Sequence, residues 1–175
     1  IPSFMCVNID RTEIGPAISV GLSSGFSSEK AIMKSIIESQ QVRQWIRYSY
    51  ILDGKPEINN PSDIIDIKER GYLWYPTKQI KELDFLIGEE SEMPEEKRDL
   101  NLDELINLLH QRNIDLYSVD ITTPEIREAG FNVVKVISPQ LHPLFLYENH
   151  PCFYSKRLEE NLKERQINLL PHPFM

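Results

Sequence analysis

Cysteine is scarce in this chain, and long apolar segments are missing. Only Cys6 and Cys152 occur among 175 residues, which is too few for a disulfide framework or for a zinc site built from several thiolates. No apolar run reaches the roughly 18 residues that a membrane-spanning helix needs, and no signal-peptide pattern is present. Two free thiols and no targeting segment predict a cytoplasmic protein.

Basic residues are in the minority. The chain has 19 lysines and arginines against 27 aspartates and glutamates, for a formal net charge of −8. Such a chain is not expected to bind nucleic acids or acidic membranes, although a local basic pocket could still hold a phosphate. Hydrophobic residues make up 41% of the chain, which is ordinary for a globular protein. Because the chain begins at Ile1 rather than at methionine, we expect it to be part of a longer protein.

Several common catalytic motifs are absent. The stretch Gly21–Gly25 is not followed by the Gly-Lys-Ser/Thr of a P-loop, and the chain has no nucleophile elbow and no His-Glu-x-x-His. The histidines lack the spacing of metal ligands. They are His110, His142, His150 and His172. These absences argue against the common hydrolase and zinc-enzyme classes, and we predict no metal ligand in this chain.

Two strands and a long helix are predicted at the start of the chain. Ser3–Ile9 and Pro16–Leu22 have the composition of buried strands. Ser27 or Ser28 can then cap a helix. Since no proline or glycine interrupts Lys30–Leu52, we predict a long helix there.

The middle of the chain predicts shorter elements. Ser62–Gly71 has the pattern of a short capped helix, and the apolar segment Tyr72–Ile87 is expected to be helical after Pro76. The stretch from 88 to about 100 is acidic and has no apolar periodicity, so we expect a mobile surface loop.

The second half predicts alternating helices and strands. A helix begins at Leu102, a strand covers Ile114–Ile121, a short helix starts with Thr123 as N-cap and Pro124 at its first position, and a β-branched strand covers Phe131–Ile137. This order predicts an α/β fold class with α+β layers, in which a mixed sheet packs against helices. A charged helix is expected over Tyr154–Arg165, followed by an extended, proline-stiffened tail over 166–175.

One arginine interrupts the apolar face of the long helix. At about 100° per residue that face gathers Ala31, Ile32, Ser35, Ile36, Val42 and Ile46. Arg43 falls between Ile32 and Ile36 on the same face. Because an unpaired buried arginine is costly, we expect it to meet an acid, a carbonyl or a phosphate. A salt-bridged or snorkelling structural arginine and a phosphate-binding arginine both fit this pattern.

Asp120 also has two interpretations. It ends a predicted buried strand just before Thr122-Thr123-Pro124, a common place for site residues in α/β folds. An aspartate there can equally cap the short helix that follows.

The long helix and its neighbours resemble the YcaO-domain family. The helix carries Ala31-Ile32-x-Lys34-Ser35-Ile36-x-Glu38-x-x-Gln41-x-Arg43, which is similar to the family's Ala-Ile-x-Arg-Ala-x-x-Glu-x-x-Gln-x-Arg. Lys34 and Ser35 stand where relatives have arginine and alanine. The glycine-rich strand end Gly21–Gly25 before the helix also resembles the family pattern.

Three later segments extend the resemblance. Asp120–Ile126 and Val133–Pro139 are similar to the family's Asp-x-Thr-x-Pro segment and to its strand that runs into a proline-led loop. Arg157-Leu158 resembles a late Arg-Leu pair. The end, Pro171-His172-Pro173-Phe174, looks like the proline-rich tail of YcaO cyclodehydratases, with Met175 in place of the last proline.

This resemblance implies that residues 1–175 are the C-terminal portion of a YcaO domain. YcaO enzymes use ATP and magnesium to phosphorylate backbone amide oxygens of ribosomally made peptides, which gives azoline heterocycles or thioamides. The family's main ATP and magnesium ligands lie on two earlier helices, and no match to them precedes Ile1. We therefore expect the chain to be inactive alone.

The resemblance also implies site residues. Arg43 becomes a candidate nucleotide-phosphate contact, with Glu38 and Gln41 as lesser cofactor-binding candidates. The tail would thread towards the active site, where its terminal carboxylate could act as a base or positioning group. The catalytic candidates in the tail are Pro171, His172, Pro173 and Met175.

Expected partners follow from the same resemblance. They are a ribosomal precursor peptide, a leader-peptide-binding partner protein and the rest of the YcaO domain, with a homodimer left open. A second hypothesis is a non-catalytic scaffold that docks the precursor peptide and partner enzymes of a bacteriocin-type synthetase.

Overall fold

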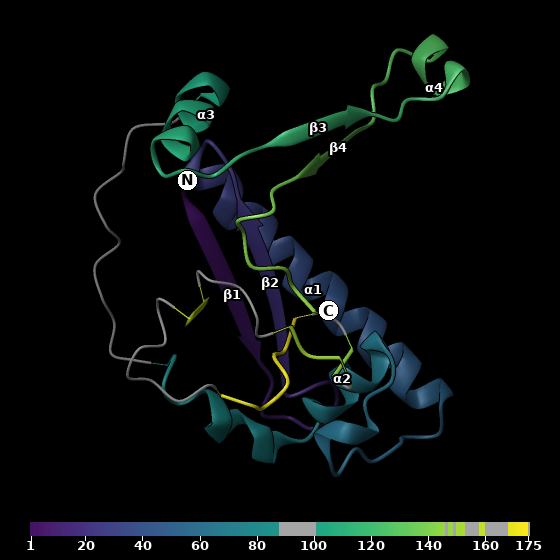
Figure 1. Cartoon of the computed structure of the whole chain (residues 1–175). Coiled ribbons are helices and arrows are strands. Elements are labelled where there is room, and N and C mark those ends of the chain that lie inside the picture. The colour runs from purple at the N-terminus through teal and green to yellow at the C-terminus, as the bar shows by residue number, and fades with distance from the viewer. Residues whose placement is uncertain (88–100, 146, 149, 153–157, 160–167, 175) are drawn as a thin grey trace. The chain divides into compact units, whose positions relative to one another are not determined.

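The computed structural model describes residues 1–87, 101–145, 147–148, 150–152, 158–159 and 168–174 (Figure 1). The chain divides into two compact units. The first comprises Ile1–Leu100, Phe145–Pro151 and Asn168–Met175, and the second comprises Asn101–Leu144 and Cys152–Ile167. The predicted acidic loop and most of the predicted helix Tyr154–Arg165 lie outside the described residues, as does Arg157.

The first unit begins with the predicted hairpin and long helix. Strands β1 (Ser3–Ile9) and β2 (Ile18–Ser24) pair antiparallel, with Cys6 opposite Gly21. Helix α1 (Ser28–Leu52) follows, and the Ser27 side chain accepts a hydrogen bond from the backbone N–H of Lys30. The N-cap prediction is confirmed. The prediction that β1 is a buried strand is wrong, because its residues are exposed or half-buried.

The buried face of α1 is narrower and more polar than predicted. Its buried residues are Ala31, Ser35, Ser39, Val42, Ile46 and Ser49. Ser35 and Ser39 donate to the carbonyl oxygens of Ile32 and Ile36, each at 2.8 Å, so these hydroxyls are satisfied within the helix. Ile36, predicted to face the core, is 44% exposed.

Gly21 allows α1 to pack directly on β2. A Cβ at this position would lie 2.0 Å from the carbonyl oxygen of Ser35 and 2.5 Å from the amide nitrogen of Ser39. Real Cβ atoms do not approach backbone atoms so closely. Small residues on both elements therefore set the distance between helix and sheet.

We expect Gly21→Ala to lower the free energy of unfolding by about 3 kcal/mol, because the added methyl group overpacks this contact. Urea unfolding followed by circular dichroism measures the change. Gly25→Ala is the matched control, since a Cβ there would meet its nearest atoms at 3.8 and 3.9 Å. Equal stability of the two variants would contradict the account of this contact.

Three short helices complete the regular structure described in the first unit. They are η1 (Pro61–Asp63), α2 (Ile67–Leu73) and η2 (Thr77–Leu83), of which η1 and η2 are 3₁₀ helices. The predicted helix after Pro76 is thus a 3₁₀ helix, and the predicted helix over Ser62–Gly71 is divided between η1 and α2.

The main core of the first unit joins β2 to the segments that follow α1. It contains Ala17, Ile18, Val20, Ile64, Leu73, Trp74, Ile80 and Leu83. The backbone N–H groups of Ala17 and Ile18 donate to the carbonyl oxygens of Tyr75 and Trp74. Trp74, at the end of α2, is thereby fixed beside the first residues of β2.

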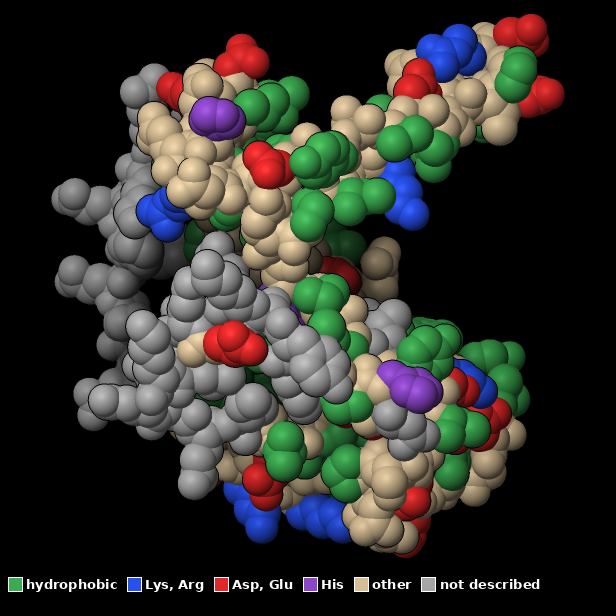
Figure 2. Space-filling view, in the orientation of Figure 1, with side chains coloured by type: hydrophobic (Ala, Val, Ile, Leu, Met, Phe, Trp, Pro, Cys, Tyr) green, Lys and Arg blue, Asp and Glu red, His purple; other side chains and the backbone are tan. Residues whose placement is uncertain are grey.

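The second unit is a helix followed by a hairpin with a helical tip. Helix α3 (Leu102–Gln111) precedes β3 (Tyr117–Asp120), α4 (Pro124–Glu128) and β4 (Val134–Ile137), and the two strands pair antiparallel. Thr123 is the N-cap residue of α4, as predicted. All residues of both strands are exposed, so the predicted burial of the strand that Asp120 ends is wrong. Figure 2 shows hydrophobic side chains along this hairpin.

The α/β fold class is confirmed by this combination of helices and small sheets. Both sheets among the described residues are antiparallel pairs. None of the described helices is long and apolar enough to cross a membrane.

Candidate functional site

Arg43 forms an ion pair at the edge of the buried face of α1. Its Nη2 atom donates to Oδ2 of Asp10, which lies just after β1. The side chain of Asp10 is 7% exposed and that of Arg43 is 20% exposed. Arg43 therefore meets an acid, as the sequence allowed, and its guanidinium keeps some access to solvent.

The loop between β1 and β2 orients this pair. Oδ1 of Asp10 accepts hydrogen bonds from the hydroxyl and the backbone N–H of Thr12, at 2.5 and 2.7 Å. These bonds, together with the bond from Arg43, lower the pKa of Asp10 from 3.8 to about 2. A Cβ at Gly15 would lie 2.9 Å from Nη2 of Arg43, so the glycine leaves room for the guanidinium. Asp10 is charged at neutral pH and holds Arg43 in one orientation.

The lowered pKa predicts an acid-dependent contribution to stability. Asp10→Asn is expected to lower the free energy of unfolding by about 1.5 kcal/mol at neutral pH, where a charge-assisted bond is lost. Because the pKa is below its ordinary value in the folded state, this contribution is complete above pH 3.8 and disappears as the pH falls towards about 2.

Thermal unfolding of both proteins across this pH range measures the difference. The exposed Asp84 provides the control variant Asp84→Asn. A difference between wild type and Asp10→Asn that stays constant down to pH 2 would contradict the assignment.

The other two candidates on α1 do not join Arg43. Oε2 of Glu38 accepts a hydrogen bond from the backbone N–H of Leu22 at 2.9 Å, so Glu38 braces β2. Gln41 is exposed, and its side chain bonds to no other described residue. At about 100° per residue, Gln41 lies roughly 160° around the helix from Arg43 and about 60° from Glu38. The three residues therefore occupy two faces of α1.

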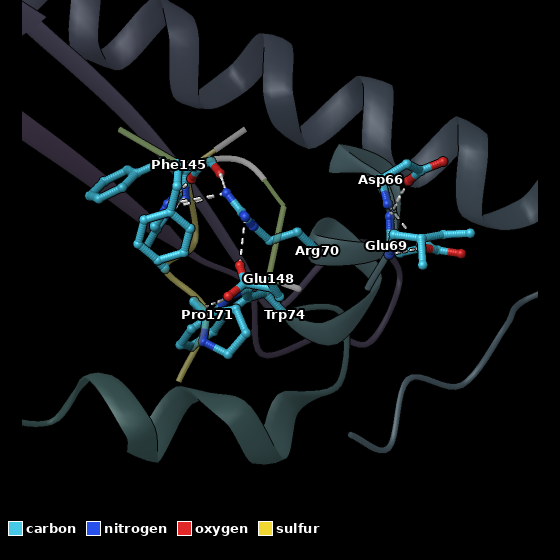
Figure 3. A network of polar contacts seen from close by, with 10 residues as sticks. Asp66, Glu69, Arg70, Trp74, Phe145, Glu148 and Pro171 are labelled. Carbon is cyan, nitrogen blue, oxygen red and sulfur yellow. Dashed lines mark hydrogen bonds and ion pairs between the residues drawn. The ribbon is translucent and has the colours of Figure 1, made fainter. Parts of the chain in front are cut away.

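The proline-rich tail lies against α2 (Figure 3). Pro171 and Pro173 are buried and His172 is half-buried. The indole Nε1 of Trp74 donates to the carbonyl oxygen of Pro171 at 3.0 Å. Met175 lies outside the described residues. The partial enclosure that we expected for His172 is present.

A buried arginine that the sequence interpretation missed faces the tail. The side chain of Arg70, on α2, is 0% exposed, and its Nη2 lies 2.5 Å from Oε1 of Glu148. Its Nη1 lies 3.1 Å from Nε2 of His172 and 3.5 Å from the carbonyl oxygen of Phe174. Figure 3 shows Arg70 between α2 and the segment that carries Phe145 and Glu148.

Helix α2 presents Arg70 in a fixed direction. Asp66 caps the helix by accepting from the N–H of Glu69, and the Glu69 side chain accepts from the N–H of Asp66 in return. This capping box stabilises a helix of only seven residues. Arg70 and Trp74 lie four residues apart, and both contact the tail. An arginine one turn before a tryptophan, with only Gly71, Tyr72 and Leu73 between them, was the available sequence signal.

The surroundings of His172 favour the neutral form of its imidazole. Burial and the nearby Arg70 guanidinium lower its pKa, and the hydrogen bond to the carbonyl oxygen of Phe145 opposes this shift. With the proton on Nε2, the imidazole donates to that oxygen at 3.2 Å. Its Nδ1 then accepts from the N–H of Phe174 at 3.3 Å and faces Nη1 of Arg70 at 3.5 Å. In this tautomer Nδ1 accepts from Phe174 and from Arg70, while the closer approach of Nη1, 3.1 Å from Nε2, brings two donors together.

The structure places the described tail candidates, Pro171, His172 and Pro173, beside α2 and leaves the α1 candidates outside this cluster. Among the described residues, no hydrogen bond or ion pair joins Arg43, Glu38 or Gln41 to the tail. Arg43 forms its own pair with Asp10 instead. The tail cluster and the Arg43–Asp10 pair both belong to the first unit.

Asp120 has a local role in the second unit. Its Oδ1 accepts from the N–H and the hydroxyl of Thr122, and its Oδ2 pairs with Nη2 of Arg127 at 2.7 Å. The carboxylate therefore closes the turn into α4. Within the described part of the chain, no group of three or more histidine, cysteine or acidic residues could hold a metal ion.

Comparisons with known proteins identify the family to which this chain is similar. A family model described as YcaO cyclodehydratase, ATP- and Mg²⁺-binding, matches residues 1–142. Among solved structures, the chain is similar to a heterocyclase in complex with substrate and cofactor, with a TM-score of 0.60 and 20% identity. That likeness covers 99% of this chain and 23% of the heterocyclase, so the chain spans less than a quarter of its length. No curated protein matches the chain.

Proposed function

The chain belongs to the YcaO cyclodehydratase family, and we propose that it forms part of an enzyme that uses ATP to activate backbone amides of a ribosomally made peptide. When bound, ATP would supply a phosphoryl group to the amide oxygen with release of ADP, and after attack by a neighbouring side chain or another nucleophile that oxygen would leave as phosphate, which gives an azoline ring or a thioamide. The family match over residues 1–142 is the observation that carries this proposal.

Arg43 is proposed to contact a phosphate of the nucleotide. Asp10 engages Nη2, and no other nitrogen of the guanidinium has a hydrogen-bond partner among the described residues. The remaining donors are partly accessible, since the side chain is 20% exposed. A planar guanidinium held by a carboxylate on one side is well suited to bind phosphate on the other. The residues present therefore fit a phosphate contact.

Glu38 and Gln41 are proposed to contribute to the nucleotide site in a lesser way. They lie close together on α1, on a face separate from Arg43. Glu38 keeps one carboxylate oxygen beyond the bond that it accepts from Leu22. Since the described residues hold no cluster of metal ligands, we propose that the magnesium ligands come from other parts of the enzyme.

The tail is proposed to contribute to the reaction through residues 171–175. Pro171 and Pro173 have fixed backbone angles and no N–H group, so the tail enters its site as a stiff segment with little entropy to lose. The neutral His172 adds no positive charge beside Arg70. We propose that Pro171, His172, Pro173 and Met175 present the end of the tail to the reacting amide, where a carboxylate would act as a base or positioning group.

We propose a precursor peptide, a leader-peptide-binding protein and the rest of the YcaO domain as partners, in the cytoplasm. Mass spectrometry of a candidate precursor peptide incubated with the full-length protein, ATP and Mg²⁺ tests the function. The proposal predicts loss of one water mass for each ring formed, dependent on ATP. Binding of the peptide without any mass change would instead favour a docking scaffold.

A further inference from the structure

The Arg70–Glu148 ion pair is buried, and a contribution to stability does not by itself explain why. Both side chains are almost fully removed from solvent, at 0% and 9% exposure. Taking two charges out of water costs so much that a buried ion pair adds little stability compared with an apolar pair of similar size. The direction in which Glu148 holds the guanidinium therefore says more about the role of Arg70 than the stability of the pair does.

One side of the guanidinium faces Glu148, and the other faces the tail. Nη2 is paired with Glu148 at 2.5 Å. Nη1 lies within 3.5 Å of the His172 ring and of the carbonyl oxygen of Phe174. Because the donors of a guanidinium form a rigid fork, the pair with Glu148 also fixes the direction of Nη1.

The tail needs donors, and α2 supplies them. Pro171 and Pro173 have no N–H, so this part of the tail can be held mainly through its carbonyl oxygens. Arginine and the tryptophan indole are donor-only groups. Trp74 binds the carbonyl oxygen of Pro171 at 3.0 Å, and Arg70 reaches that of Phe174 at 3.5 Å. Two side chains of one helix thus contact the tail at points three residues apart.

We propose that Arg70 is a positioning residue, which together with Trp74 fixes the register of the tail on α2 and so determines where residues 171–174 lie. Glu148 orients the guanidinium and balances its charge. This inference rests on the proposed function insofar as it concerns catalysis, but the ordering of the tail can be measured without activity. A shift by one residue would place a proline ring where His172 now sits.

Hydrogen–deuterium exchange of the peptide covering residues 168–174 in the full-length protein tests this role. Arg70→Met combined with Glu148→Met removes both charges and leaves no unpaired buried ion. We expect exchange in the tail to be at least about tenfold faster, with an unchanged melting temperature and a kcat for peptide modification about tenfold lower. The KM for ATP should stay unchanged, because the cluster has no contact with Arg43.

Two further variants sharpen the test. Arg70→Lys keeps a counter-ion for Glu148 but lacks the fork, so we expect faster exchange even if the double variant folds poorly. Lys68→Met, also on α2, is the matched control, since it breaks the ion pair with Asp53 after α1 and should leave the tail unchanged. Unchanged exchange in both Arg70 variants would overturn the positioning role. Undiminished modification after deletion of the tail would instead contradict the proposed function.

Discussion

Deletion of residues 171–175 from the full-length protein is expected to lower the rate of peptide modification by at least about 100-fold, because groups that position or deprotonate a reacting centre contribute on this scale. Pro171 and Pro173 are buried, and the bonds from Trp74 and Arg70 hold residues 171–174 in one place. The rate of ATP-dependent mass loss in the precursor peptide measures the effect.

Controls separate this effect from loss of folding. The melting temperature of the deletion variant reports whether the core around Trp74 survives. Leu169→Ser changes a tail side chain that is 71% exposed and should leave the rate unchanged. A folded deletion variant with the wild-type rate would show that the tail has no part in the reaction.

Arg43→Ala in the full-length protein is expected to raise the dissociation constant for ATP by about 10- to 100-fold, as loss of charge-assisted hydrogen bonds to phosphate predicts. Arg43→Lys should lie in between, because lysine keeps the charge but loses the planar fork. Isothermal titration with ATP and Mg²⁺ measures the constants.

The ion pair with Asp10 requires its own control. If Arg43 only braces the loop after β1, then Asp10→Asn, which breaks the same pair, will reproduce the full effect of Arg43→Ala on ATP binding. A phosphate contact predicts that Asp10→Asn weakens binding only slightly, since the guanidinium remains. Equal effects of the two substitutions would assign Arg43 a purely structural role.

Local signals in the sequence predicted the helices well. Ser27 caps α1 with its side chain, and Thr123 occupies the N-cap position of α4 without a side-chain capping bond. Such positions could be predicted because a cap depends on residues within one turn of each other. Periodicity was less reliable for burial. α1 has apolar residues on several sides, and Met33, Ile37 and Trp45 are 55, 49 and 40% exposed. Apolar residues on several sides of a helix do not show which side packs against the rest of the protein.

The candidate site depended on long-range contacts that the sequence could not reveal. Arg70 meets Glu148 and His172, which lie 78 and 102 residues further along the chain. No local pattern links an arginine to partners at such distances. His172 was found through its place in the proline-rich tail. Of the acid, carbonyl or phosphate expected to meet Arg43, the structure shows an acid, Asp10. The sequence could single out candidate residues by their type and position, but only the folded structure shows which residues they contact.

The exposed hairpin of β3 and β4 illustrates the same limit. Its β-branched residues predicted the strands, which the structure contains between Tyr117 and Ile137. The strand that ends at Asp120 was predicted to be buried, yet both strands are exposed throughout. Composition predicts the backbone conformation, while burial also depends on what packs against the strand.

The fate of the peptide's amide oxygen provides the most direct test of the central claim. A precursor peptide labelled with oxygen-18 at the reacting amide would be incubated with the full-length protein, ATP and Mg²⁺. If the amide oxygen is phosphorylated, the label will appear in the released phosphate, and much less of it will form with Arg43→Ala. Ring formation with the label found only in water, or no transformation of the peptide at all, would contradict the account.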